Sequence, residues 1–125
     1  MILGIGIDIC PVNRIADVIE RQGDAFVNRV YTKTEIAYCQ KAVKSVKEER
    51  LAARWAAKEA AIKALGAPLK ITWHELEVVN SADGAPSLIL GKAARQHADS
   101  MGVKNILLSI SHAGGTAVAV VIAEG

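Results

Sequence analysis

The sequence predicts an α+β fold in which a largely antiparallel sheet packs on one long central helix. The segment up to residue 66 has mostly helical periodicity after an initial strand, and the segments after residue 68 read as strands joined by short turns. Because helices and most strands are segregated along the chain, parallel βαβ units are not expected. A chain of 125 residues has the size of one domain, so residues 1–125 are expected to share a single core.

Composition excludes several classes of protein. The chain is 51% hydrophobic and 22% charged, as in folded globular domains and unlike disordered ones. It has no apolar run of about 18 residues, so no membrane span is expected, and its apolar start contains Asp8 and no basic region, unlike a signal peptide. Cys10 and Cys39 match neither a disulfide framework nor a zinc site, which favours a reducing, cytoplasmic setting.

The first strand is expected over residues 2–9. Alternation places leucine and isoleucine side chains on one face, and Gly4, Gly6 and Asp8 on the other. Two glycines leave the strand backbone open on the face that carries Asp8. A packed helix or a ligand is therefore expected to approach this face closely.

Four helices are expected between the first strand and residue 66. Their starts are marked by proline or aspartate, or by Thr or Ser followed three residues later by Glu, which is the capping box. The expected helices run from Pro11 to Gly23, from Asp24 as a short helix that buries Phe26, Val27 and Val30, from Thr32 with Glu35 to about Val43, and from Ser45 with Glu48 to Leu65 and Gly66.

The last of these helices is apolar on two sides. One side carries large residues and the opposite side carries alanines, so the helix is expected to be sandwiched, with its alanine side close to another backbone. The large residues are Leu51, Trp55, Ile62 and Leu65, and the alanines are 53, 57, 60 and 64.

The C-terminal half is expected to hold two hairpins. The first pairs residues 76–80 with 86–90 across the turn at 81–84, and the second pairs 105–112 with 116–123 across residues 113–115. A short helix over residues 92–101, closed by Gly102, lies between them.

Charge is unevenly distributed. The net charge is +2, but eight basic and three acidic residues give the segment 41–70 a charge of +5, and the remainder sums to −3. A local basic surface suits a phosphorylated ligand or an acidic partner protein. Aromatic residues make up only 4% of the chain, too few to stack bases, so no nucleic acid partner is expected.

Asp8 interrupts an apolar strand, and two interpretations are open. Aspartate is a favoured helix cap, so Asp8 could cap the helix that begins at Pro11. Alternatively, it is a metal-binding carboxylate on the face that the glycines leave open.

The Lys58-Glu59 pair, with Lys63 one turn further on, is a second candidate. Glu59 and Lys63 have the spacing of a surface ion pair on a helix. Lys58, however, projects into the same sector as Trp55 and Ile62, where a charge is costly without a partner. A buried lysine beside a half-buried glutamate favours a site over a solvated face.

Ser111 and His112 end a strand at a glycine turn. A lone histidine there is most often a turn residue, and no hydrolase elbow or Ser-His-Asp triad accompanies it. The glycines of Gly4-Ile5-Gly6 lack the third glycine of a dinucleotide fingerprint, and there is no Walker A sequence.

Three motifs, weak singly, together resemble one family. They are Gly4-Ile5-Gly6-Ile7-Asp8-Ile9, then Arg54-Trp55-Ala56-Ala57-Lys58-Glu59-Ala60 followed by Lys63, and finally Ser109-Ile110-Ser111-His112 before the last strand. In order and spacing they resemble the holo-acyl-carrier-protein synthases, the small phosphopantetheinyl transferases of fatty acid synthesis, over nearly the whole chain.

The resemblance implies an activity and a set of site residues. The family transfers the phosphopantetheine arm of coenzyme A to a serine of acyl carrier protein, requires magnesium, and releases adenosine 3′,5′-bisphosphate. By the motif match, Asp8 and Glu59 are the metal carboxylates, and magnesium accepts one or two carboxylates plus water and phosphate oxygens. The same match implies catalysis by Lys63, coenzyme A binding by Arg54, Lys58, Ser111 and His112, and carrier protein binding by Arg14 and Arg21.

Some features depart from the family pattern or leave alternatives open. The long helix carries Trp55 where the family often has phenylalanine, and the loops Gly66-Ala67-Pro68 and Gly84-Ala85-Pro86 replace the usual Gly-Thr-Gly and Gly-Lys-Pro. The resemblance also implies a homotrimer with sites between neighbouring chains. Two alternatives are a metal-independent, thioesterase-like coenzyme A-binding domain and a non-enzymatic module that docks an acidic protein.

Overall fold

The strands form two antiparallel sheets rather than one. In the computed structural model, which describes residues 1–66 and 71–125, the larger sheet has the order β1-β5-β4 and the smaller pairs β2 with β3. The expected loop at 66–68 falls mostly outside the described residues. The strands are β1 Ile2–Pro11, β2 Leu76–Asn80, β3 Pro86–Leu90, β4 Asn105–Ala113 and β5 Thr116–Glu124. The prediction of an α+β fold on a long helix is confirmed.

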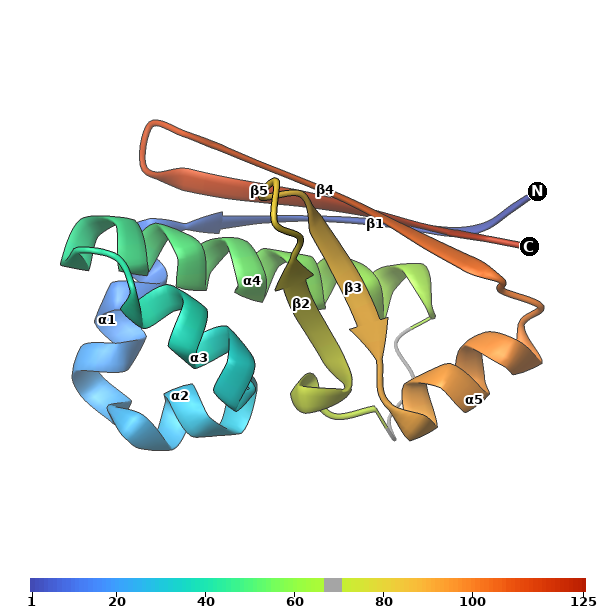
Figure 1. Ribbon diagram of the computed structural model, residues 1–125, viewed down its shortest axis with the longest axis horizontal. Coiled ribbons are helices and arrows are strands. Elements are labelled where there is room, and N and C mark those ends of the chain that lie inside the picture. Colours follow the sequence, from blue (N-terminus) through green and yellow to red (C-terminus); the bar gives the residue numbers. More distant parts are fainter. Residues whose placement is uncertain (67–70) are drawn as a thin grey trace.

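One long helix underlies the larger sheet. Figure 1 shows α4 running beneath β1, β5 and β4, with α1, α2 and α3 gathered at one end of the molecule and α5 at the other. The helices are α1 Val12–Gln22, α2 Asp24–Val30, α3 Lys33–Gln40, α4 Lys44–Ala64 and α5 Lys92–Ser100, and a 3₁₀ turn, η1, spans Trp73–Glu75. Every expected helix is present, although α3 ends three residues before the predicted Val43.

One of the two predicted capping boxes forms. The Thr32 hydroxyl accepts a hydrogen bond from the Glu35 backbone, and the Glu35 carboxylate accepts one from the Thr32 backbone, which fixes the start of α3. The box predicted at Ser45 and Glu48 is wrong. The capping position lies two residues earlier, at Val43, and the helix begins at Lys44, so Ser45 already lies inside the first turn.

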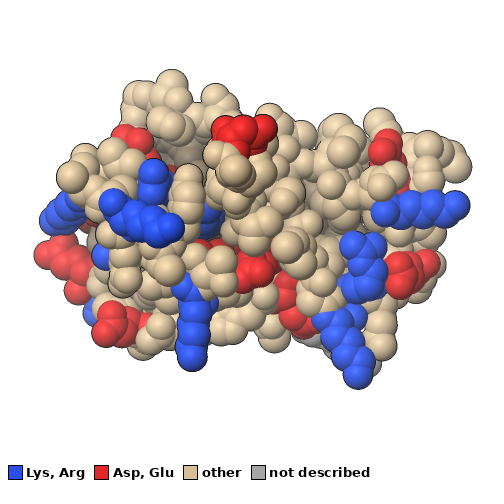
Figure 2. Space-filling model, in the orientation of Figure 1, with Lys and Arg blue, Asp and Glu red and all other residues tan. Residues whose placement is uncertain are grey.

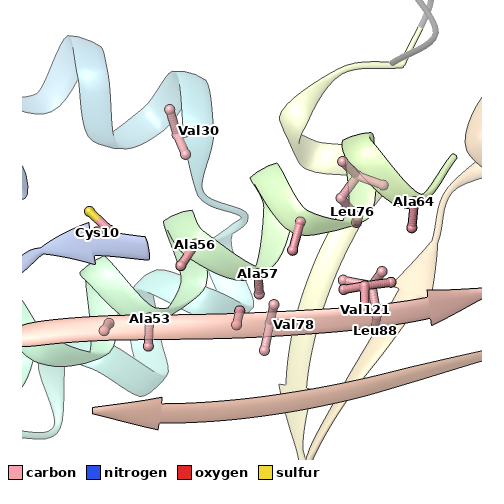
Figure 3. Close-up of a cluster of buried hydrophobic side chains, with 14 of the residues drawn as sticks. Cys10, Val30, Ala53, Ala56, Ala57, Ala64, Leu76, Val78, Leu88 and Val121 are labelled. Atoms are coloured by element: carbon pink, nitrogen blue, oxygen red, sulfur yellow. The ribbon is translucent and has the colours of Figure 1, made fainter. Parts of the chain in front are cut away.

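The predicted sandwich around α4 is confirmed. Its alanine side lies against the larger sheet, with Ala57 and Ala60 fully buried. Figure 3 shows Ala53, Ala57 and Ala64 of this side in one cluster with Val121 of β5. Its other side packs on β2 and α3. The glycines of β1 explain the close approach: a Cβ on Gly4 or Gly6 would collide with the carbonyl oxygens of Ala64 or Ala60.

The outer face of the larger sheet is apolar and exposed. Ile5, Ile7 and Ile9 of β1 are 59–63% exposed, and the strand register places them beside valine and isoleucine side chains of β5. Leu107 of β4 extends the same face and is also exposed.

No helix within the described residues is long and apolar enough to cross a membrane. Figure 2 shows basic and acidic side chains at both ends of the molecule.

We predict that Gly6→Ala destabilises the fold strongly. The added methyl group meets helix backbone, which cannot rotate away, so the free energy of unfolding should fall by about 3 kcal/mol, the upper part of the usual range for overpacking. Urea unfolding measures this change. Gly114→Ala is the control, because its added methyl group meets open space and only its positive φ of 59° costs energy, about 1 kcal/mol. Equal losses in the two variants would contradict the close contact.

Candidate active site

Asp8 faces α4 from the inner side of β1. Its carboxylate lies 3.4 Å from the ammonium group of Lys63, which also donates a hydrogen bond of 2.9 Å to the carbonyl of Ile7. Asp8 therefore turns toward the long helix rather than toward the start of α1, and the interpretation of Asp8 as a helix cap is wrong. The side chain of Lys63 is 55% exposed, so its charge stays accessible to a ligand at this edge of the sheet.

Glu59 lies one helical turn before Lys63 on α4 and is half-buried. Burial raises the pKa of its carboxyl group, the negative charge of Asp8 raises it further, and Lys63 partly opposes both. Among the described residues Lys63 forms its ion pair with Asp8 and not with Glu59, so the interpretation of Glu59 and Lys63 as a helical ion pair is wrong. The result is two neighbouring carboxyl groups that share one cation.

Two carboxylates of this kind fit a magnesium ion. Magnesium prefers oxygen ligands and is usually held by one or two carboxylates, the other positions going to water and substrate phosphate. The described residues contain no cluster of three or more His, Cys, Asp or Glu side chains that would hold a metal by themselves. Asp8 and Glu59 therefore suit an ion that is completed by a phosphorylated ligand.

A second set of predicted residues lines a separate pocket of about 350 Å³. Arg54 of α4 and His112 of β4 both line it, together with Gly84 of the β2–β3 turn and Pro86 at the start of β3. The imidazole of His112 lies 3.7 Å from the carboxylate of Glu49. The altered 84–86 loop is thus part of the wall that Arg54 and His112 share.

Ser111 does not line this pocket. Successive residues of a strand point to opposite faces, so Ser111 lies on the outer face of the larger sheet, while Ile110 and His112 lie on the inner one. Its Cα is paired with that of Val118, in the same row as Ile9. Within a single chain, the predicted binding residues Ser111 and His112 are therefore not brought together.

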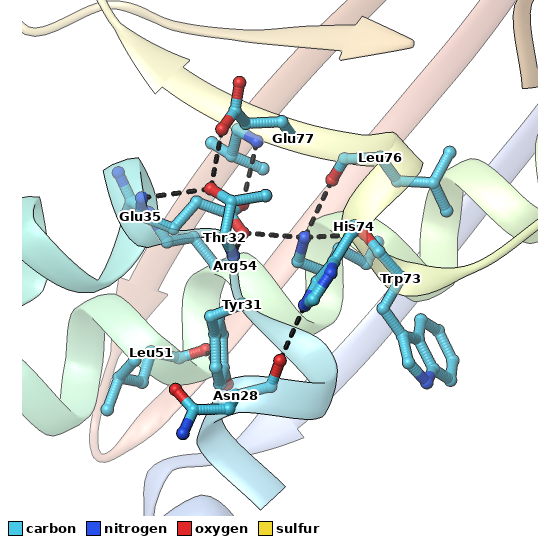
Figure 4. Close-up of polar contacts among 12 residues, drawn as sticks. Asn28, Tyr31, Thr32, Glu35, Leu51, Arg54, Trp73, His74, Leu76 and Glu77 are labelled. Carbon is cyan, nitrogen blue, oxygen red and sulfur yellow. Dashed lines mark hydrogen bonds and ion pairs between the residues drawn. The ribbon is translucent and has the colours of Figure 1, made fainter. Parts of the chain in front are cut away.

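Lys58 is buried as predicted, but its partner is not the one that the sequence indicated. Its ammonium group is fully buried, forms an ion pair of 2.8 Å with Glu35, and donates hydrogen bonds of 2.9 Å to the carbonyls of Trp73 and Leu76 (Figure 4). Burial lowers the pKa of Lys58, and Glu35 opposes that shift. Its three donors are used inside the protein, so the predicted contact of Lys58 with substrate is wrong for this structure. The partner is Glu35 and not the neighbouring Glu59.

Asp8 and Glu59 lie on the β1 side of the larger sheet, which we call the carboxylate edge. Arg54 and His112 line the pocket of about 350 Å³ on the β4 side, which we call the arginine pocket. Asp8 of β1 is paired with Ala119 of β5, which is paired with Ile110 of β4. Two strand spacings of about 4.8 Å put nearly 10 Å between the backbones of Asp8 and Ile110, and α4 lies beneath both. One chain therefore carries two separate groups of candidate residues.

Arg14 and Arg21 lie exposed on α1, the helix that follows the Asp8 strand directly. The Nε of Arg21 donates a hydrogen bond to the backbone of Asp17, one turn earlier. Arg14 is near the end of β1, close enough for its charge to lower the pKa of Cys10 against the larger effect of burial. Both arginines thus project from the helix next to the carboxylate edge.

Three polar residues that the motifs did not indicate also line the arginine pocket. Tyr38 of α3, Arg50 of α4 and Asn80 of β2 line it beside Arg54. The spacing of Arg50 and Arg54, one helical turn apart, was a signal that both side chains share a side of α4. Nothing in the local sequence around Tyr38 or Asn80 indicated that they would meet those arginines.

Comparison with known proteins identifies the family. A family model described as the 4′-phosphopantetheinyl transferase superfamily matches residues 4–121, nearly the whole chain. The chain belongs to this superfamily. It is an enzyme of the transferase class, and the resemblance inferred from the three motifs is confirmed. Membership excludes the alternatives of a thioesterase-like domain and of a non-enzymatic docking module.

Relatives within the superfamily match along their full length. A protein of Solibacter usitatus named holo-[acyl-carrier-protein] synthase is 47% identical, and the match covers 99% of both chains. The crystal structure of holo-[acyl-carrier-protein] synthase from Neisseria meningitidis is 34% identical and superposes with a TM-score of 0.89 over 100% of both chains. The Helicobacter pylori synthase, crystallised in complex with coenzyme A, is 30% identical with a TM-score of 0.83, over 96% of this transferase and 99% of that chain.

We predict that Glu59→Gln raises the melting temperature at pH 7 when no metal is added. The pKa of Glu59 is raised above 4.5 in the folded state, so the folded protein binds this proton more tightly than the unfolded chain does. Ionisation of Glu59 therefore reduces stability as pH rises through the window above 4.5, and neutral glutamine avoids that loss.

Thermal unfolding should show the Glu59→Gln variant a few degrees above the wild type at pH 7, with the difference shrinking below pH 4.5, where the wild-type carboxyl group is protonated in both states. Glu20→Gln, on the exposed face of α1, is the matched control and should change nothing. A lower melting temperature for Glu59→Gln at pH 7 would contradict the assigned environment.

Proposed function

We propose that this transferase moves the 4′-phosphopantetheine arm of coenzyme A to a serine hydroxyl of acyl carrier protein, with magnesium, as one domain over residues 1–125. The serine hydroxyl releases its proton to solvent, its oxygen bonds to the phosphorus that carries the pantetheine arm, and the bond from that phosphorus to the bridging oxygen breaks, its electron pair staying on the oxygen of the leaving group. Adenosine 3′,5′-bisphosphate leaves. An acceptor of this kind places the reaction in fatty acid synthesis, and two free, buried cysteines agree with a cytoplasmic setting.

The observation that carries the proposal is the grouping of Asp8, Glu59 and Lys63 where β1 meets α4. Asp8 and Glu59 would hold the magnesium ion, which supplies positive charge to the pyrophosphate as its phosphorus–oxygen bond breaks. Asp8 in turn holds the Lys63 ammonium group at 3.4 Å. From there Lys63 binds an oxygen of the leaving phosphate, whose negative charge grows during the reaction.

The arginine pocket binds another part of coenzyme A. Arg54 supplies a buried positive charge, and His112 of β4 lines the same pocket. Ser111, on the outer face of the sheet, reaches a ligand only where a second molecule covers that face. Arg14 and Arg21 project from α1 beside the carboxylate edge and attract an acidic carrier protein by charge.

We infer that a complete site is built from two copies of the chain. A coenzyme A molecule in one arginine pocket would meet the Asp8 and Glu59 of a neighbouring copy, since the chain's own carboxylates lie at the far edge of its sheet. The exposed isoleucine face supports such a neighbour, because an apolar surface of this kind is typical of subunit interfaces. In a homotrimer each copy would contact the next in this way, and the third copy would contact the first.

We predict that the protein adds one phosphopantetheine group to an apo acyl carrier protein when coenzyme A and magnesium are present. Mass spectrometry of the carrier protein measures the addition, and chelation of the metal should abolish it. Asp8→Ala should lower the rate at least about a hundredfold, or ~2.7 kcal/mol, because it removes both a metal ligand and the partner of Lys63. Unmodified carrier protein, or full activity of Asp8→Ala at high magnesium, would contradict the proposal.

The same assay separates carrier protein binding from chemistry. Arg14→Glu reverses an exposed charge on α1 that is not one of the proposed metal ligands, so it should raise KM for the carrier protein and leave KM for coenzyme A nearly unchanged. Equal changes in both KM values would remove Arg14 from the docking surface.

We predict that two inactive variants restore activity when they are mixed. Asp8→Ala damages the carboxylate edge, and His112→Glu places a negative charge in the arginine pocket. In mixed oligomers some sites combine the intact Asp8 of one variant with the intact His112 of the other. After unfolding and refolding together in equal amounts, about a quarter of wild-type activity should return, since that share of interfaces is intact on both sides. A mixture as inactive as its components would show that each site lies within one chain.

A further inference from the structure

Tyr38 joins two arginines of the pocket. The guanidinium carbons of Arg50 and Arg54 lie 4.3 and 4.4 Å from the centre of its ring, within the range of cation–π attraction. The carbonyl of Tyr38 also accepts a hydrogen bond of 2.9 Å from Nη1 of Arg50. One residue of α3 thereby restrains two side chains of α4, which stand one turn apart and would otherwise repel each other.

Asn80 extends this arrangement to the loop on the other side of the pocket. Its Oδ1 accepts a hydrogen bond from Nη2 of Arg54, and its Nδ2 donates one of 3.0 Å to the carbonyl of Gly84. The chain of contacts therefore runs from α3 through both arginines to the β2–β3 turn. All five residues of this chain of contacts line the same pocket: Tyr38, Arg50, Arg54, Asn80 and Gly84.

The arginine pair is charged and incompletely satisfied. Arg54 is only 4% exposed, and within residues 1–66 and 71–125 its Nε is a buried side-chain nitrogen without a hydrogen-bond partner. A buried donor without a partner costs free energy that an acceptor arriving with a ligand recovers. Among the described residues that line the pocket, Glu49 carries the one carboxylate, and that carboxylate lies beside His112. The charges of the two guanidinium groups are therefore not neutralised within the pocket.

We propose that Arg50 binds a phosphate of coenzyme A together with Arg54, and that Tyr38 and Asn80 are positioning residues that hold this pair in place. The inference rests on the proposed function and deepens it, because it names the phosphate as the group of coenzyme A that the pocket binds. Two guanidinium groups held in a fixed relation suit a phosphate, which accepts several hydrogen bonds from different directions. The ring of Tyr38 acts through its face, so its hydroxyl group is dispensable.

Calorimetric titration with coenzyme A, without carrier protein so that no transfer occurs, tests the proposal. Tyr38→Leu keeps apolar bulk but removes the ring face, and its Kd for coenzyme A should rise at least about fivefold. Tyr38→Phe retains the face and should bind within about twofold of the wild type, because the arginines still stack. Arg50→Gln should weaken binding by at least about fivefold and reduce its dependence on salt, since one charge is lost.

A matched control and a coupling measurement separate positioning from stability. Arg29 stacks on Phe26 at 5.9 Å and does not line the pocket, so Arg29→Gln removes a similar contact and should leave the Kd unchanged. In the double variant Tyr38→Leu/Arg50→Gln, the loss should be smaller than the product of the single losses, because Tyr38 acts through Arg50. The initial rate at saturating coenzyme A should stay near the wild-type value for Tyr38→Leu, so that KM changes and kcat does not.

The outcomes distinguish the inference from the proposed function. If the wild type binds no coenzyme A, the proposed function fails. If the wild type binds it and Tyr38→Leu and Arg50→Gln bind equally well, the positioning role is overturned while the function stands. If Tyr38→Leu does not fold, Arg50→Gln and Tyr38→Phe decide alone: unchanged binding by Arg50→Gln, or a large loss in Tyr38→Phe, overturns the inference.

Discussion

The close contact between the glycines of β1 and the backbone of α4 positions everything else in this protein. Gly4 and Gly6 have no side chains to hold the strand away, so it lies directly on the carbonyl groups at Ala60 and Ala64. Asp8, one residue pair further along the same face, is thereby brought beside Lys63 of the helix. A strand with larger residues would stand further off, and the carboxylate would lose its contact with the helix.

The other side of α4 is fixed by a buried ion pair. Glu35 accepts hydrogen bonds from the backbones of Thr32 and Val78 as well as from Lys58, so it ties α3, β2 and α4 together (Figure 4). Removing either charge would leave its partner buried and uncompensated, which is far more costly than the net value of the pair. Lys58 points toward α3 and β2, where Glu35 and the carbonyls of Trp73 and Leu76 bind it. Consecutive side chains lie 100° apart around a helix, so the next residue, Glu59, points toward the carboxylate edge.

Local patterns predicted the elements well, since each depends on signals within a few residues. The glycines of β1, the alanine side of α4 and the capping box at Thr32 all behave as their sequence indicates. The failures have two different causes. Lys58 was assigned to a site because nothing near it in the sequence indicated its partner, Glu35, which lies 23 positions away on another helix. The capping box at Ser45 failed because the helix starts at Lys44, which places Ser45 inside the first turn.

The exposure of the isoleucine face of β1 was not predicted. The glycines correctly indicated that a helix or a ligand approaches their face closely, but the alternation did not show that Ile5, Ile7 and Ile9 stay outside. The positions of Tyr38 and Asn80 could not be predicted either, because they come from three different elements together with the arginines they contact. Such contacts exist only after the helices and the small sheet have assembled.

The placement of carboxylates and arginine pocket on opposite edges of one sheet bears on how copies of the chain would be arranged. Contacts that join the carboxylate edge of one copy to the pocket edge of the next are head-to-tail, unlike the self-complementary contacts of a twofold dimer. In an open row of such copies, the carboxylate edge at one end and the arginine pocket at the other end would each lack a partner, and each would be only half of a site. Only a closed ring gives every copy a complete site, so ring closure, and not merely association, would determine how many of the half-sites can work.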